Sequence, residues 1–166
     1  MHTSSDQLGR ERHWHYDAVF FVALVATGIA FGAALAHALE LPNKLSLSRE
    51  NYFIVQDIYR GWWQLAFVLL IEIVAMIALL VLSRRQKRVF GFVLVALLGV
   101  VAAQIVFWIW TYPANAATQN WTVIPENWEM LRRQWEFSHL AGAGFQFVAF
   151  CALILAALAS RRTENC

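Results

Sequence analysis

The chain has 166 residues, of which 60% are apolar and only 14% carry a formal charge, and its mean hydropathy is +0.51. This composition excludes an ordinary soluble globular domain. The net charge of +2 is small and the basic residues form no patch interleaved with stacking aromatics, so no nucleic-acid partner is expected.

Four long apolar runs divide the sequence. Each has about 20 residues, enough for a helix to cross ~30 Å of hydrocarbon, and Glu72 is the only formal charge within them. The sequence therefore predicts an all-α, four-transmembrane-helix bundle in contact with membrane lipid. The predicted spans are about Ala18–Leu39, Trp62–Leu82, Val89–Trp110 and Leu140–Ala159, in one membrane domain (18–159) between a polar N-terminal segment (1–17) and a tail (160–166).

The two longer loops contain signals for helix ends. Pro42 predicts a break after the first span, and Ser48 is a residue type that caps the start of a helix, here one that runs on through the second span to Leu82. Pro113 predicts the end of the third helix, and Pro125 the first turn of the fourth. A helix from residue 125 to 159 would be about 50 Å long, so two helices are expected to extend into an outer aromatic-rich cap.

Basic residues predict the orientation of the bundle. Eight of the 13 lysines and arginines lie in the N-terminal segment, the loop between spans two and three, and the tail. By the positive-inside rule both termini are cytoplasmic, in a multi-pass protein of the plasma (inner) membrane. Seven of the eight tryptophans then lie at the outer end, with Trp14 inside. This asymmetry fits either a pocket for a flat aromatic molecule or the packing of an ordered cap.

The stretch before the fourth span holds the strongest candidate site. At helical spacing, Trp128, Arg132, Trp135 and His139 share one stripe. His139 could act as a base and Arg132 could hold an anion, although Arg132 could equally pair with a neighbouring glutamate. The residues expected to complete a substrate site are Asn115 and, on the stripe that precedes the second span, Tyr59 and Trp63.

Two further groups of polar residues fall within the membrane. His37 and His139 lie near the outer ends of two spans, where a histidine pair could ligate haem, although hydrogen-bonding histidines are commoner. Glu72 lies near the bilayer midplane, with Gln104 and Gln146 as intramembrane hydrogen-bonding candidates. A neutral carboxyl bonded between helices is the preferred interpretation, and a proton relay the alternative. No other metal site is expected.

The pattern Pro113-Ala-Asn115, followed by Pro125-x-x-Trp128-x-x-x-Arg132-x-x-Trp135-x-x-x-His139 and a last helix rich in small residues, resembles the anthrone-oxygenase-like family. Thr27-Gly28-x-x-x-Gly32 in the first span fits as well, and the similarity covers about residues 18–159. These are small four-helix integral membrane proteins, long catalogued as a domain of unknown function. Fungal members are implicated in oxidising anthrones to anthraquinones with molecular oxygen, and most bacterial members have no established activity.

The resemblance implies a cofactor-free oxygenase or oxidase acting on a lipophilic phenolic or quinone-type substrate at the outer face. His139 would then be the base, Arg132 and Asn115 the anion holders, and the aromatic residues a flat slot. The alternative is a non-catalytic accessory or assembly subunit of a larger membrane complex, whose cap docks protein partners. A haem-binding electron carrier through His37 and His139 is a further alternative.

Overall fold

The structure, a computed structural model, describes the backbone of residues 4–164 and the side chains of residues 14–161. Among these residues, four helices are long and apolar enough to cross a membrane. This confirms the predicted all-α bundle of four spans in a multi-pass membrane protein. The spans are Trp14–Leu45, Trp62–Ser83, Lys87–Ala117 and Trp128–Arg161, and many large apolar side chains on their outer faces are exposed, where lipid would cover them.

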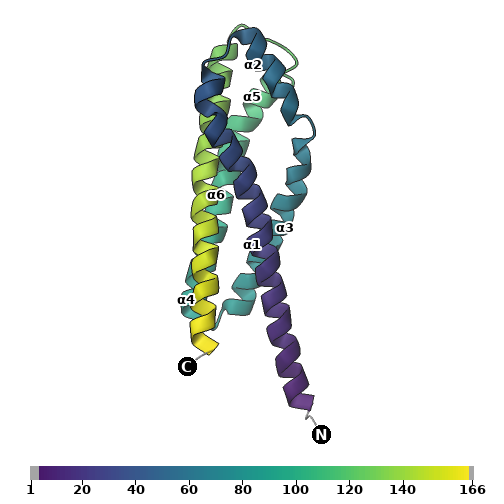
Figure 1. Cartoon of the computed structure of the whole chain (residues 1–166), viewed down its shortest axis with the longest axis vertical. Coiled ribbons are helices and arrows are strands. Elements are labelled where there is room, and N and C mark those ends of the chain that lie inside the picture. The colour runs from purple at the N-terminus through teal and green to yellow at the C-terminus, as the bar shows by residue number, and fades with distance from the viewer. Residues whose placement is uncertain (1–3, 165–166) are drawn as a thin grey trace.

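The four long helices pack in a ring, each against two neighbours, in the order α1, α3, α4 and α6. The described ends of α1 and α6 lie at one end of the bundle, and the short helices α2 and α5 lie at the other (Figure 1). The elements are α1 Ser4–Leu45, α2 Arg49–Gln56, η1 Asp57–Tyr59, η2 Trp62–Gln64, α3 Leu65–Ser83, α4 Lys87–Val106, the π-helical turn η3 Phe107–Thr111, α5 Tyr112–Ala117 and α6 Trp128–Glu164.

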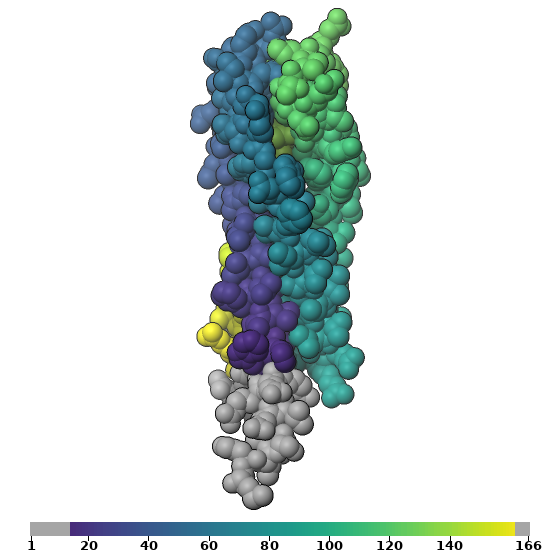
Figure 2. Space-filling view, turned by 90° about the vertical axis from the view of Figure 1, so that its right-hand side faces the viewer, coloured from purple at the N-terminus to yellow at the C-terminus, as the bar shows by residue number. Residues whose placement is uncertain are grey.

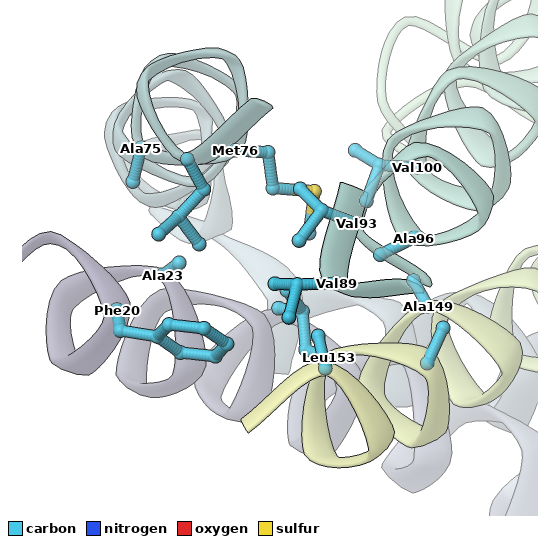
Figure 3. Packing of buried hydrophobic residues seen from close by; sticks show 13 residues of the cluster. Phe20, Ala23, Ala75, Met76, Val89, Val93, Ala96, Val100, Ala149 and Leu153 are labelled. Atoms are coloured by element: carbon cyan, nitrogen blue, oxygen red, sulfur yellow. The ribbon is translucent and has the colours of Figure 1, made fainter. Parts of the chain in front are cut away.

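The main core occupies the half of the bundle away from α2 and α5. Side chains of all four long helices point into it, with Met76 of α3 and Val93 of α4 among them (Figure 3). Alanines supply much of the rest of this core, and Gly99 of α4 lies against the backbone of α6 at Phe145. Because lipid offers no hydrophobic gain for helix association, such small residues stabilise a membrane bundle by letting backbones approach closely.

The expected break at Pro42 is wrong, because α1 continues to Leu45. A proline near the end of a helix removes one backbone hydrogen bond, and packing of the helix against its neighbours can offset that loss. The last turn of α1 is held in this way: Lys44 is buried and ion-paired to Glu136 of α6. The consequence is that Lys44 enters the bundle instead of lying in an exposed loop.

Ser48 caps a helix as predicted, since its side-chain oxygen accepts a hydrogen bond from the backbone of Asn51. The continuous helix from Ser48 to Leu82 is wrong, however. The chain turns after Tyr59 and starts again at Trp62, and Gly61 between them has a φ of 93°. Glycine adopts that left-handed backbone without steric cost, and it therefore allows α2 to fold across the end of the bundle while α3 runs down it.

Pro113 does not end the third helix, which continues through η3 and α5 to Ala117. In an ordinary α-helix the proline ring would clash with the carbonyl four residues earlier. Here the backbone is π-helical just before it, and Tyr112 donates its N–H to Phe107, five residues back. The wider turn relieves the clash, and the side chain of Gln134 on α6 donates to the Trp110 carbonyl at 2.7 Å.

The last helix begins at Trp128 and not at Pro125, because residues 125–127 form a turn in which Trp128 N–H donates to the Pro125 carbonyl. Before it, Gln119, Asn120 and Trp121 all have positive φ values, and Trp121 is nonetheless buried. We call α2, η1, α5 and residues 118–127 the cap. Its core combines Tyr52, Ala114 and Trp121 of the cap with Leu131 and Trp135 of α6, which confirms an aromatic-rich cap over the bundle.

Candidate functional site

A cavity of ≈ 770 Å³ lies between the cap and the main core, bounded by all four long helices. Its walls are mostly apolar, with Ala34 of α1, Leu69 of α3 and Phe107 of α4 among the lining residues. Near the cap, a narrow groove separates the start of α3 from the end of α4 and α5, and α6 is visible through it (Figure 2). Trp63 of η2 and Trp108 of η3 line the cavity, and they are 70% and 60% exposed on the outer surface.

His37 and His139 lie together in the wall of this cavity. Their rings are stacked, with 4.1 Å between centroids and 13° between planes. Trp135 packs edge-on against both rings, at 4.1 Å from His139 and 5.1 Å from His37, and Tyr59 lies 4.5 Å from His37. His37 is buried, and its Nδ1 has no hydrogen-bond partner within the part of the chain that the structure describes. The sequence predicts that both histidines lie at a similar depth in the membrane, and the structure places their rings in direct contact.

The stacked pair does not fit the bis-histidine haem alternative. Axial imidazoles approach the iron end-on from opposite faces of the porphyrin, whereas these two rings lie face to face with no room for a macrocycle between them. Among the residues described, no group of three or more histidine, cysteine, aspartate or glutamate side chains could hold another metal ion.

Asn115 supports the aromatic wall. Its side-chain oxygen accepts hydrogen bonds from the indole N–H groups of Trp135, at 2.8 Å, and of Trp121, at 3.1 Å. Each buried indole N–H would otherwise be left without an acceptor. Asn115 lines the cavity, but its oxygen is used to fix the position of Trp135 beside the histidine pair.

Arg132 and Trp128 do not line this cavity, although they share a helical stripe with Trp135 and His139. Arg132 donates to the backbone carbonyl of Leu47 at 3.0 Å, and its guanidinium lies over the ring of Trp128 at 4.7 Å. Arg132 therefore fastens α6 to the segment before α2. The expected pairing of Arg132 and His139 in one site is not what the structure shows, because the guanidinium of Arg132 bonds to Leu47 and lies over Trp128 instead.

Of the other predicted site residues, four line the cavity and one, Glu72, is buried beside it. Tyr59, Trp63, Gln104 and Gln146 line the cavity. Glu72 does not line it but is fully buried beside it, where the side-chain amide of Gln146 donates to one carboxyl oxygen at 3.4 Å. The structure thus brings Glu72 and Gln146 together as one hydrogen-bonded pair between α3 and α6.

A buried polar network beside the histidines was not predicted. Lys44 and Glu136 are 2% and 0% exposed, and the Lys44 ammonium lies 3.2 Å from the Glu136 carboxylate. Tyr52 donates to Glu136 at 2.9 Å, Lys44 donates to the Tyr59 hydroxyl at 2.8 Å, and that hydroxyl donates to Glu40. The one signal for it in the sequence is the spacing of Glu40 and Lys44, four residues apart on one helix face.

Both tyrosines of this network lie outside the membrane spans. Burial, together with the adjoining Glu136 carboxylate, raises the pKa of Tyr52 far above its ordinary value. Burial and the hydrogen bond to Glu40 likewise raise the pKa of Tyr59. The two phenols consequently keep their protons throughout the neutral range and act as hydrogen-bond donors.

No protein-family model matches the chain, and comparisons with curated proteins and with solved structures also found no match.

Proposed function

We propose that this chain binds a flat, lipophilic phenolic or quinone-type molecule in its cavity and oxidises it with molecular oxygen, without a cofactor. The observation that carries the proposal is the stacked pair His37–His139 in the wall of a mostly apolar cavity. Such a combination supplies a base next to a slot for a planar ring system.

The size and the opening of the cavity suit this class of ligand. Its ≈ 770 Å³ falls in the range of about 300–1,000 Å³ that small-molecule sites occupy. Trp63 and Trp108, which line the cavity, are exposed on the outer surface, and the groove near the cap lies between the membrane-spanning segments Trp62–Ser83 and Lys87–Ala117 (Figure 2). A lipophilic molecule could enter through it from the bilayer, where such a compound is concentrated.

The chemistry needs one base and oxygen. For an anthrone, His139 would take a proton from the methylene carbon, and the electron pair left there would add to O₂. That proton returns to the peroxide anion and gives a hydroperoxide. The second proton then leaves the same carbon while the O–O bond breaks, so that a carbonyl forms. The hydroxide released from the O–O bond combines with this proton to give one water. Anthrone and O₂ thus give anthraquinone and water. The amides of Gln104 and Gln146, both on the cavity wall, are candidates to bond the carbonyl oxygen as charge develops on it.

The proposal places the cap at the outer face of the plasma membrane, with both termini cytoplasmic. Its support is the cluster Arg84, Arg85, Lys87 and Arg88, all exposed at the end of the bundle opposite the cap. Lysine and arginine near span ends are enriched on the cytoplasmic side.

Oxygen consumption by the purified protein in lipid nanodiscs tests the proposal. Anthrone should be converted to anthraquinone faster than in empty nanodiscs, with one O₂ consumed per product. His139→Gln should lower the rate by about 10²-fold or more while anthrone still quenches tryptophan fluorescence. Conversion no faster than in empty nanodiscs, together with stoichiometric copurification of another membrane protein, would favour the accessory-subunit alternative.

A further inference from the structure

The network around Lys44 connects the wall of the cavity to the surface of the molecule. Its buried part is the ion pair Lys44–Glu136, and Lys44 also lies 4.5 Å from the centre of the Trp135 ring. A buried ion pair needs further hydrogen bonds to satisfy its remaining donors and acceptors. Two tyrosines provide them: Tyr52 bonds to Glu136, and Tyr59 bonds to Lys44.

The two tyrosines differ in what lies beyond them. Tyr52 is completely buried, and so are the groups beside its hydroxyl, Glu136 and Gln56, so this branch does not reach the surface. Tyr59 donates to Glu40, whose side chain is 40% exposed, so this branch ends at the surface. Only the Tyr59 branch could therefore exchange protons with water outside the protein.

The same tyrosine faces the cavity. Tyr59 lines it, and its ring packs against that of His37 with 36° between the ring planes. Close by, both polar atoms of the Gln56 amide, one oxygen of Glu136 and Nδ1 of His37 are buried without a hydrogen-bond partner among the described residues. Buried polar atoms of this kind are normally bonded by internal water. The polar end of the cavity is therefore a place where water molecules could link the histidines to the Tyr59 hydroxyl.

We propose that Tyr59 and Glu40 form a proton relay between the histidine pair and the surface, held in place by Lys44 and Glu136. This inference rests on the proposed function. The phenol oxygen of Tyr59 accepts a proton that comes from His139 through water molecules beside His37, as its own proton passes to the Glu40 carboxylate. Glu40 then releases that proton to solvent, and the reverse path can return one to the peroxide.

The protonated state in which the Tyr59 phenol rests suits such an exchange. Since burial and Glu40 raise the pKa of the phenol, it stays protonated between transfers and no tyrosinate accumulates. Lys44 and Glu136 do not transfer the proton. They are positioning residues: the ammonium of Lys44 fixes the oxygen of Tyr59, and Glu136 fixes Lys44.

An oxygen-free experiment separates deprotonation from oxidation. Anthrone is mixed rapidly with the protein in nanodiscs under argon, the anthrone anion is followed by its visible absorption, and a pH-indicator dye follows the proton in solution. In the wild type the proton should appear at the rate at which the anion forms. In Tyr59→Phe and Glu40→Gln the proton should appear at least about ten-fold later than the anion of the same variant, whatever the rate at which that anion forms.

Tyr52→Phe is the matched control, because it removes a hydroxyl from the same network on the branch that does not reach the surface. Its proton release should follow anion formation as in the wild type. The cavity also reaches the exposed residues Asp57 and Arg60, so the proton could instead leave past the ligand. Undelayed release in both Tyr59→Phe and Glu40→Gln, or an equal delay in Tyr52→Phe, would overturn the relay alone. If the wild type formed no anion, the proposed function would fail and the relay with it.

Discussion

The imidazole rings of His37 and His139 lie parallel to one another, 4.1 Å apart between centroids, although they belong to helices at opposite ends of the sequence. A second proton on this pair would place two positive charges at that separation beside the ammonium of Lys44, which is unfavourable away from bulk water. The two rings therefore cannot both carry a charge in this arrangement. Trp135 holds both rings, and Asn115 holds Trp135.

Breaking the buried ion pair should strongly destabilise the protein. Lys44→Met or Glu136→Leu alone leaves an unpaired buried charge, and each should lower the free energy of unfolding by about 3–5 kcal/mol. The double variant removes both charges and should lose less than the sum of the two. Unfolding in detergent mixtures, followed by tryptophan fluorescence, measures all three. Additive losses in this double-mutant cycle would show that the two charges do not interact.

Filling the cavity should weaken ligand binding without unfolding the bundle. Gly142 lines the cavity, and a Cβ placed on it would meet no atom within 4 Å. Gly142→Leu should therefore extend a side chain into the space for the ligand and weaken anthrone binding by at least about ten-fold, whereas Gly144→Leu, two residues along α6 on an exposed position, should not. Titration of tryptophan fluorescence with anthrone reports the affinity. Equal affinities for the two variants would place the ligand elsewhere.

Gly99 should be the glycine of α4 that tolerates substitution least. A Cβ on it would lie 3.0 Å from the Phe145 carbonyl oxygen and 3.3 Å from the Ala149 side chain, so α4 and α6 would have to separate. Gly99→Ala should cost about 1–3 kcal/mol of stability. Gly91→Ala, where nothing lies within 4 Å, should be neutral or slightly stabilising. Thermal unfolding in one detergent compares the two, and an unchanged melting temperature for Gly99→Ala would argue against this packing.

Alkaline solution should destabilise the cap through its two buried phenols. Because the pKa values of Tyr52 and Tyr59 are raised in the folded protein, an unfolded chain loses these protons above about pH 10 while the folded chain keeps them. Their contribution to stability is complete below that pH and decreases above it. Melting temperatures measured from about pH 8 to about pH 11 should therefore fall less steeply in Tyr52→Phe/Tyr59→Phe than in the wild type. Parallel curves would indicate that neither phenol is perturbed.

The membrane bundle could be predicted from the sequence because length and apolar composition alone determine which segments cross a bilayer. The paths of the helices at the cap could not, since they depend on tertiary contacts. Pro42 stays inside α1 with Lys44 bonded to Glu136, and Pro113 stays inside the third span after a π-helical turn. Each proline correctly indicates that a backbone hydrogen bond of the helix is lost. The sequence does not show the contacts with other helices that offset this loss.

The candidate site was predictable where helical spacing determined it. Trp135 and His139 face the same side of α6 and both line the cavity, as their spacing suggested. Arg132 shares that stripe, but it donates instead to the Leu47 carbonyl in the segment between α1 and α2. Lys44 escaped prediction because the proline before it suggested an exposed loop, and helical spacing cannot show which residue of another helix, here Glu136, will lie opposite.

The measurement that tests the central claim most directly is the absorption spectrum of anthrone titrated with the protein in nanodiscs in the absence of oxygen. The account predicts that wild-type protein converts bound anthrone to its anion, and that His139→Gln binds anthrone with similar affinity and leaves it neutral. An unchanged anthrone spectrum with saturating wild-type protein, or anion formation that is just as complete in His139→Gln, would contradict it.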